Sequence, residues 1–475
     1  MRIVRPVDLG KQRQRFSGEL AARKTLFLRH LMMAGRVPFW QRAVVLLIAV
    51  VAVSSAAVCD DREPCVSAKG EESIVACTKL IEAGELQGRQ LAELFVARGL
   101  AFGGLGNLDA ENRDFTQAIQ VDAGYAIAFN NRCAVDNMQG AFDLAIKDCE
   151  AAIQLKPDYS KAYLGRGNAY RYKGDFDLAL QDYNKAVELD PKYVGAFFGR
   201  ALIDTAKGDY DAALSDYGTV LELDDKNAAG FNNRGLLFLD IRDFDRAIRD
   251  FDQAIKLVPN FVSAFNNRCS AYNSKEDYEH AIQDCDKAIQ FNLTFVRAYV
   301  NRGYAFRREN DLDRAIKDYD QAIKLDPNFS NAYYGRAQSY GIKGDHDQEI
   351  ADYDKYIELN PKNPVAWNNR CWARAIIDQL DLALPDCEES LRLRPNSPAA
   401  LNSRALIYLK SGKFDLAIAD YDASLGLRPN DANSLFGRGT AKTKKGDNIG
   451  GSDDIKKATV IQKDIADEFK RYGVS

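Results

Sequence analysis

The sequence predicts an all-α protein, a solenoid of helical hairpins built from about eleven repeats of 34 residues. Two observations predict this fold class. Large and small side chains alternate at fixed places along one period, which is typical of two packed helices rather than of strands. Prolines also recur at intervals that are multiples of 34 residues, at Pro157, Pro191, Pro259, Pro327, Pro361, Pro395 and Pro429.

Each period divides into a first helix, a turn and a second helix. With the prolines at position 32, eleven units begin at residues 92, 126, 160, 194, 228, 262, 296, 330, 364, 398 and 432. Position 4 is large and apolar, as at Phe95 and Trp367, whereas position 8 is small, as at Gly167. Position 20 is alanine in eight units, so the two helices can approach closely. Glycine at position 15 is expected to end the first helix, and aspartate at position 16 to cap the second.

One charged residue on each helix of the hairpin is the same in every unit. Position 7 is arginine and position 23 is aspartate in all eleven units. A carboxylate matches the planar guanidinium in a bidentate ion pair. Structural ion pairs are therefore expected, with binding of a ligand by the arginines as the alternative, at Arg132–Asp148, Arg234–Asp250, Arg302–Asp318 and the equivalent places.

The cysteines follow the same period. Three pairs occupy positions 8 and 24 of one unit: Cys133 and Cys149, Cys269 and Cys285, Cys371 and Cys387. No other unit has cysteine at either place, so the two positions should touch across the hairpin. They form a disulfide in an oxidising compartment, or a reduced pair that fills the space of glycine and a ring. Cys65 and Cys77 are expected to pair before the array, which leaves Cys59 as the odd cysteine, either removed with the leader or unpaired.

These features resemble the tetratricopeptide-repeat (TPR) family over about residues 92–465. The pattern of large-4, small-8, aromatic-11, Ala-20, Ala-27 and Pro-32 carries the resemblance. It implies a right-handed α-solenoid whose concave face is lined by first-helix positions 2, 5, 6, 9, 12 and 13. Residues 59–91 are then expected to form a Cys-containing N-terminal helical cap, and residues 462–475 a C-terminal capping helix. Pro385 departs from the pattern and should distort the second helix that contains it.

Asparagines are frequent on the face that the resemblance makes concave. They are Asn130, Asn131, Asn232, Asn233, Asn266, Asn267, Asn301, Asn368, Asn369 and Asn402. Such a ladder could hydrogen-bond an extended peptide, similar to the asparagine ladder of the O-linked N-acetylglucosamine transferases. The alternative is that the amides solvate the groove or bond neighbouring helices. The carboxylate clamp of chaperone-binding family members is not expected, because no unit before Arg297 and Asn301 supplies Lys-5 with Asn-9.

Residues 1–58 predict export. Ten Lys and Arg residues in 1–42 precede an apolar run from Ala43 to Val53 and then small residues, the pattern of a secretory signal peptide. Because the apolar stretch is short for a bilayer, a cleaved signal peptide is the first interpretation, and an uncleaved membrane anchor is the alternative. The first interpretation predicts a periplasmic or exported protein, and the second places the repeats on the periplasmic side of a membrane.

The remaining features predict a function in protein binding. The net charge of −4 gives no dedicated nucleic-acid surface, and three histidines without a ligand cluster predict no metal site. Neither a Gly-Lys-Ser/Thr phosphate loop nor a nucleophile elbow is present. We therefore expect a non-catalytic scaffold or adaptor, without a cofactor, that binds a protein or peptide in its groove. The alternatives are a membrane-anchored assembly factor or co-chaperone of an envelope complex and, more remotely, an enzyme of glycosyl or envelope-polymer transfer; the oligomeric state stays open.

Overall fold

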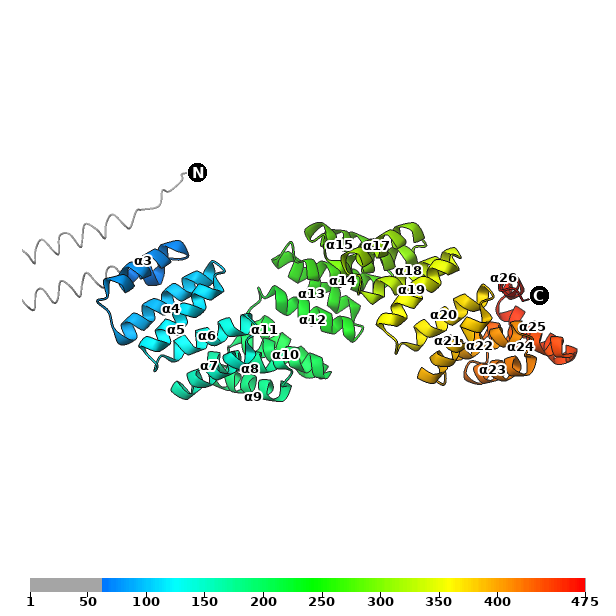
Figure 1. The fold of residues 1–475 in the computed structure, drawn as a ribbon, viewed down its shortest axis with the longest axis horizontal. Coiled ribbons are helices and arrows are strands. Elements are labelled where there is room, and N and C mark those ends of the chain that lie inside the picture. Colours follow the sequence, from blue (N-terminus) through cyan, green and yellow to red (C-terminus); the bar gives the residue numbers. More distant parts are fainter. Residues whose placement is uncertain (1–61, 475) are drawn as a thin grey trace, which may run out of the picture. The chain divides into compact units, whose positions relative to one another are not determined.

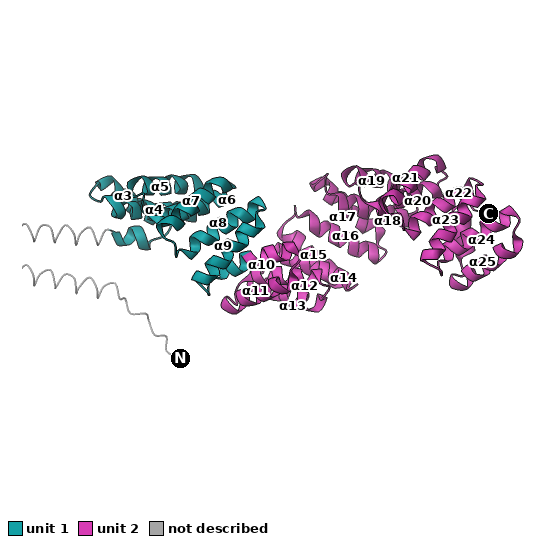
Figure 2. Ribbon diagram, turned by 90° about the horizontal axis from the view of Figure 1, so that it is seen from below, with its two compact units in different colours: residues 1–199 teal, residues 200–475 magenta. Residues whose placement is uncertain are grey.

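The computed structural model describes residues 62–474, and every regular element among them is a helix (Figure 1). The predicted signal peptide or anchor lies outside these residues. Within the described range, no helix is both long enough and apolar enough to cross a bilayer. The chain divides into two compact units, residues 1–199 and 200–475, which are described separately (Figure 2).

The helices follow one another as hairpins, which confirms the predicted all-α repeat fold. Unit 1 contains α3 (Glu71–Ala83), α4 (Gly88–Gly104), α5 (Leu108–Val121), α6 (Ala126–Met138), α7 (Phe142–Leu155), α8 (Ser160–Lys173) and α9 (Phe176–Leu189). The unit boundary falls within α10 (Val194–Lys207). Unit 2 continues with α11 (Tyr210–Leu223), α12 (Ala228–Asp240), α13 (Phe244–Leu257), α14 (Val262–Ser274), α15 (Tyr278–Phe291), α16 (Val296–Arg308), α17 (Leu312–Leu325), α18 (Ser330–Lys343), α19 (His346–Leu359), α20 (Pro364–Ile376), α21 (Leu380–Leu393), α22 (Pro398–Lys410), α23 (Phe414–Leu427), α24 (Ala432–Lys445), α25 (Asn448–Ile461) and α26 (Ile465–Arg471).

Ten of the eleven hairpins close around a ring or a disulfide at position 24, and the last has Ile455 there. Tyr183, Phe251 and Tyr319 there are at most 1% exposed. The small residue at position 8 leaves room for the ring, since a Cβ added to Gly235 would lie 2.7 Å from Phe251. The alanines at position 20 are completely buried, as at Ala315. The alternation of large and small side chains is therefore what sets the distance between the two helices.

The turn between the helices needs a left-handed residue in every repeat. Position 15 has a positive φ in all eleven units: at Gly106, Gly140, Gly174, Gly208, Gly344, Gly412 and Gly446, and also at Arg242, Glu276, Asn310 and Asp378. Aspartate at position 16 then accepts a hydrogen bond from a backbone N–H of the second helix, as Asp311 does from Arg314. The cap is present at six of the seven predicted aspartates; Asp175 makes no such bond.

Pro385 does not interrupt its helix. The second helices α5 to α25 each have 14 residues, and α21, which contains Pro385, is no shorter. The expected distortion is thus not visible in the extent of the helix. Asp386 and Cys387, directly after the proline, are both almost fully buried. Packing on both sides of α21 offsets the one backbone hydrogen bond that proline cannot donate.

The arginine of position 7 forms a bidentate ion pair with the aspartate of position 23 in all eleven hairpins. Arg302 donates from Nε and Nη2 to the two carboxylate oxygens of Asp318, at 2.8 and 2.7 Å. Its third nitrogen, Nη1, reaches back 2.5 Å to Asp286 of the preceding hairpin. Arg268, Arg336, Arg370 and Arg438 make the same third contact. One guanidinium thus joins both helices of its own hairpin and, in these repeats, the preceding hairpin as well.

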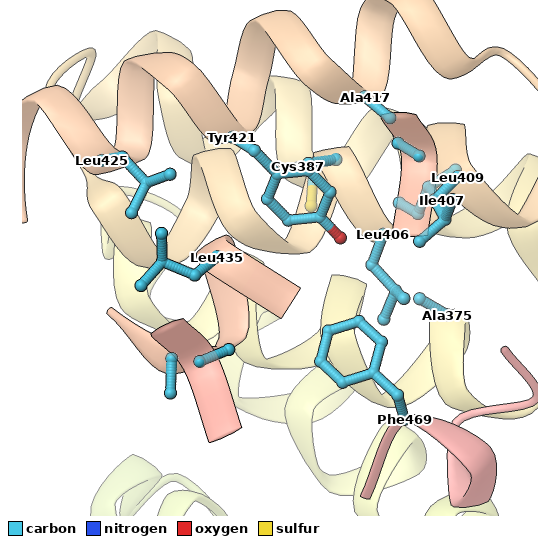
Figure 3. Packing of buried hydrophobic residues seen from close by; sticks show 14 of the residues in the cluster. Ala375, Cys387, Leu406, Ile407, Leu409, Ala417, Tyr421, Leu425, Leu435 and Phe469 are labelled. Atoms are coloured by element: carbon cyan, nitrogen blue, oxygen red, sulfur yellow. The ribbon is translucent and has the colours of Figure 1, made fainter. Parts of the chain in front are cut away.

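The C-terminal helix α26 packs on the last repeats with one face and exposes the other to water. In the structure Ile465 and Phe469 are completely buried, and Phe469 points toward Leu406 and Ala375 of the first helices (Figure 3). The helix therefore lies on the concave face of the last repeats.

We predict that Asp318→Asn and Asp286→Asn have unequal effects on stability. Both remove one carboxylate from Arg302, but the Asp318 side chain is 9% exposed and that of Asp286 is 53% exposed. Losing the buried partner should lower the free energy of unfolding by about 1–3 kcal/mol, and losing the exposed one by less than about 1 kcal/mol. Urea unfolding followed by circular dichroism measures both. Equal losses would contradict the assignment of the buried pair as the structural one.

Candidate functional site

The first helices α14, α16, α18 and α20 of unit 2 line a groove with two open cavities. One has a volume of about 330 Å³ and is lined by Ser270, Asn273, Ser274, Val300, Asn301, Tyr304, Arg307, Tyr319, Asn331, Tyr334, Gly335 and Gln338. The other has about 620 Å³ and is lined by Arg307, Gln338, Gly341, Ile342, Lys343, Gly344, His346, Glu349, Tyr353, Asn369, Trp372, Ile376, Arg471 and Tyr472. Arg307 and Gln338 border both, so the two cavities are continuous along one face.

Arg307 lies at the junction of the two cavities. Its guanidinium is 5.2 Å from the centre of the Tyr304 ring. Its Nε is buried and makes no hydrogen bond. Within residues 62–474, no ion pair joins Arg307 to a carboxylate, whereas Arg302 five residues earlier has two. Arg307 is therefore a cation in the groove whose charge no carboxylate of the described chain neutralises.

Tyrosines surround this arginine. The ring of Tyr334 lies 5.8 Å from that of Tyr353, edge to face. Asn369 donates hydrogen bonds to the hydroxyl oxygens of both, at 3.4 and 3.1 Å. Burial raises the pKa of Tyr334 and of Tyr353, and raises the pKa of Tyr319 to about 12. These phenols stay neutral at any physiological pH and present ring faces and hydroxyl groups to the groove.

Glu349 is a buried carboxylate in the wall of the second cavity. It stands at position 20, where most repeats have alanine, and Gly341 opposite provides the space: a Cβ there would lie 2.7 Å from Glu349 Oε1. His346 Nδ1 lies 2.8 Å from Oε2. Burial raises the pKa of Glu349, and the hydrogen bond with His346 opposes that shift.

The first repeat has the same combination of residues. Glu111 is at position 20 and Gly103 at position 12, and the carboxylate lies over the glycine. Glu111 is 6% exposed, its Oε2 has no hydrogen-bond partner, and burial raises its pKa. The pairing of Glu-20 with Gly-12 within one repeat was a signal present in the sequence that could have identified both buried carboxylates.

The predicted asparagine ladder is present, and many of its amides bond neighbouring helices. Asn267 donates to Asn232 Oδ1 at 3.0 Å, and Asn301 donates to Asn266 Oδ1 at 2.9 Å. Position 6 of one repeat thus bonds position 5 of the repeat before it. The pattern extends to Asn369 with Tyr334 and to Ser403 with Asn368.

The other predicted amides have varied environments. Asn130, Asn232, Asn266 and Asn368 each donate to the next residue, namely Asn131, Asn233, Asn267 and Asn369, at 3.3–3.5 Å. Asn402 donates to Asp431 and Ser434. Of the whole set, Asn301 and Asn369 line the cavities. Sequence reasoning missed Tyr304, Arg307, Tyr334 and Trp372, although their positions 5, 9 and 12 were among those expected to face the groove.

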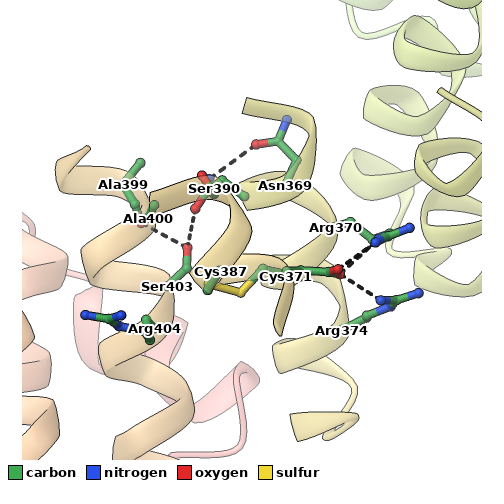
Figure 4. Close-up of a disulfide and its surroundings, with 12 residues drawn as sticks. Asn369, Arg370, Cys371, Arg374, Cys387, Ser390, Ala399, Ala400, Ser403 and Arg404 are labelled. Carbon is green, nitrogen blue, oxygen red and sulfur yellow. Dashed lines mark hydrogen bonds and ion pairs between the residues drawn. A yellow bond between two sulfur atoms is a disulfide. The ribbon is translucent and has the colours of Figure 1, made fainter. Parts of the chain in front are cut away.

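The structure contains disulfides at all four cysteine pairs that the sequence singled out. Cys133–Cys149, Cys269–Cys285 and Cys371–Cys387 have Cα–Cα distances of 5.6, 5.7 and 5.5 Å, and Cys65–Cys77 4.7 Å. Cys371–Cys387 bridges α20 and α21 beside Arg370 and Arg374 (Figure 4). The three bridges within repeats occupy the place that a ring over a small residue takes in the other hairpins.

Family comparisons agree with this geometry. Tetratricopeptide repeat models match residues 160–193, 232–292 and 398–431, and a TPR repeat model matches residues 303–344. The matches lie in both units and follow the hairpins. This chain is a tetratricopeptide-repeat protein. The repeat model of the protein prenyltransferase alpha subunit also matches this TPR protein at residues 346–375, which cover α19 and nearly all of α20.

Solved structures similar to this TPR protein include other TPR proteins, whereas no curated protein matches it. YrrB, described as a TPR protein with an unusual peptide-binding site, is 24% identical with a TM-score of 0.33, over 39% of this chain and 97% of its own. The APC/C hetero-tetramer Cut9–Hcn1 is 15% identical with a TM-score of 0.45, over 83% and 84%. A TPR protein from Parabacteroides merdae is 19% identical with a TM-score of 0.41, over 53% and 99%.

We predict that Glu349→Gln stabilises this TPR protein at neutral pH and that the gain shrinks in acid. Because burial raises the pKa of Glu349, the folded state keeps a proton that the unfolded chain loses above the ordinary value of 4.5. The stability that this proton contributes is complete below that pH and is lost as the pH rises toward the folded pKa. Glutamine cannot ionise, so it removes the free-energy cost of the buried carboxyl group at neutral pH, which is on the order of 1 kcal/mol. Thermal melts from pH 4 to pH 7.5, about the range in question, test this.

Glu111→Gln is the matched variant for this prediction. Glu111 occupies the same position 20 but has no histidine partner, and one of its oxygens makes no hydrogen bond. Its neutralisation should therefore give the larger gain at neutral pH. A gain that is the same at every pH for both variants would contradict the raised pKa values.

Proposed function

We propose that this TPR protein is a non-catalytic scaffold that binds a peptide or protein segment in the groove of unit 2. The observation that supports it is Arg307, a guanidinium without a carboxylate partner that lies among tyrosines on an open concave face. Tyrosine, tryptophan and arginine are the side chains that contribute most at protein interfaces. Trp372 at the far end of the second cavity completes such a set.

The amide ladder fits this role in part. Asn301 and Asn369 line the cavities, and a peptide N–H can be directed toward the carbonyl oxygen of either, although that of Asn369 already accepts a long hydrogen bond from Asn368. Their Nδ2 groups already donate to Asn266 and to the two tyrosines, which fixes the orientation of the amides. Preorganised polar groups lose little entropy when a ligand binds.

We further propose that the scaffold works in the periplasm of a bacterium. The export pattern of residues 1–58 and the four disulfides support this location. A chain that keeps its apolar segment would present the same groove from a membrane anchor, as an assembly factor of an envelope complex.

A photoreactive p-benzoylphenylalanine in place of Tyr304 is expected to cross-link a protein partner in the native host. The same residue in place of Lys324, which is exposed on the second helix α17, is the control and should not capture that partner. Mass spectrometry identifies the captured segment, which is then made as a purified peptide.

Arg307→Ala should weaken binding of that purified peptide by about tenfold or more, as loss of an interface anchor does. Arg308→Ala is the matched control, because Arg308 is exposed and pairs with Glu276. Equal effects of the two variants, or capture only from Lys324, would contradict groove binding.

The periplasmic location predicts that the cysteine pairs are oxidised in the cell. Protein from the native host is alkylated before and after reduction, and its peptides are mapped by mass spectrometry. Linked peptides are expected at 65–77, 133–149, 269–285 and 371–387, and the first peptide should begin near Val58. A mature chain that retains residues 43–58 would favour the anchored form. Free thiols at all these cysteines would contradict export.

A further inference from the structure

Helix α26 lies on the concave face that the first helices of the last repeats form. The Phe469 ring is 4.7 Å from that of Phe436 on α24, and Tyr472 meets Trp372 of α20 edge to face at 5.0 Å. Phe436 is at position 5 and Trp372 at position 9 of their repeats, which are groove positions. Beyond α26 the chain reaches Gly473, where an added Cβ would lie 3.4 Å from Lys410 Nζ. The segment thus runs back along the groove from the last repeat toward α20.

The end of the stack does not require α26 as a cover. At position 28 of five earlier second helices an apolar side chain is buried: Leu221, Ile289, Ile357, Leu391 and Leu425 are 6–8% exposed. The equivalent residue of the last repeat is Thr459, which is exposed. A hydroxyl group at this place suits contact with water. The exposed Thr459 therefore needs no cover by α26, whose buried side chains lie against α20, α22 and α24.

The side chains of α26 show what this part of the groove accepts. Ile465, Phe469 and Tyr472 follow a spacing of i, i+4 and i+7 and share one face of a helix. Phe469 fills a site formed by Leu406 and Ala375 (Figure 3). Phe436 forms another side of this site. A helix of seven residues is not stable in water by itself. The groove therefore holds this segment helical, as it would hold a bound ligand.

We propose that residues 462–474 are a displaceable internal ligand, and that the concave face of α20, α22 and α24 binds a partner's short amphipathic helix with apolar side chains at i, i+4 and i+7. This inference rests on the proposed groove-binding function and names the ligand class. Arg471 and Tyr472 form one wall of the open second cavity. A partner segment that lies along the groove from Arg307 meets this wall and competes with α26 for the Phe469 site.

The test uses the full chain and a fluorescent synthetic peptide of residues 462–474. Phe469→Ala weakens the internal segment but leaves the groove intact, so this variant should bind the peptide at least about tenfold more tightly than the wild type. The same peptide carrying Phe469→Ala should not bind. Adding Leu406→Asp to the protein variant should abolish binding, whereas adding Leu416→Asp, at an exposed leucine of α23, should not. Equal affinity of wild type and Phe469→Ala, or no binding to Phe469→Ala, overturns the proposal.

Hydrogen exchange on the wild-type chain tests the same point without a variant. Amides of α26 should exchange well before those of α24, because the internal ligand opens while the array stays folded. Exchange of α26 and α24 at one common rate would make α26 a fixed part of the fold and overturn the proposal. A concentration-dependent dimer that Phe469→Ala abolishes would assign the groove to the tail of a second copy, which also overturns it.

The failure of this inference differs from failure of the proposed function. If cross-linking from Tyr304 succeeds and the 462–474 peptide does not bind Phe469→Ala, only the internal-ligand proposal is wrong. If the peptide binds and cross-linking from Tyr304 fails, the groove takes helices at its C-terminal end and the partner site around Arg307 is wrong.

Discussion

The ion pair between position 7 and position 23 holds the hairpins of this protein in register. Each arginine grips an aspartate on the other helix of its hairpin through two parallel hydrogen bonds, as Arg302 does with Asp318. In five repeats the remaining nitrogen donates to an aspartate of the preceding hairpin. In a solenoid each hairpin contacts only its neighbours, so an error in one crossing angle is passed along the stack. A rigid guanidinium that bonds both the other helix of its hairpin and the preceding hairpin fixes both crossing angles and limits that error.

The disulfides solve a packing problem that other repeats solve with a ring. Position 24 must fill the space above a small residue at position 8, and both the Phe251–Gly235 pair and the Cys269–Cys285 bridge do so. A bridge across a separation of 16 residues adds about 3 kcal/mol by restricting the unfolded chain. A ring contributes burial and, at Tyr183 and Tyr353, a hydrogen bond of its hydroxyl group. The three cysteine repeats are therefore local clamps, and in unit 2 two of them, on α14–α15 and α20–α21, flank the groove that contains Arg307.

Periodicity made most of the fold predictable, because every hairpin repeats the same constraints. The left-handed turn at position 15 was predictable where glycine stands there, but not at Arg242 or Asp378, where the surrounding hairpin imposes the conformation on a less suitable residue. The groove was harder to predict. The amides were singled out because they recur, yet their recurrence reflects bonds between neighbouring helices, such as Asn301 with Asn266. The position of α26 was not predictable, because the repeat pattern ends before it.

Residues that break the repeat are therefore the ones that carry the groove's chemistry. A side chain that stacking requires must be present in most repeats, whereas Arg307 and Glu349 each recur in one other repeat, as Arg171 and Glu111, and Trp372 recurs in none. Glu349 illustrates how much stability such a residue can cost the hairpin. Its burial needs Gly341 opposite and a hydrogen bond with His346, and it still has a raised pKa. Such a residue weakens the stack at neutral pH. Its position in the wall of the second cavity places this cost where the proposed ligand would bind.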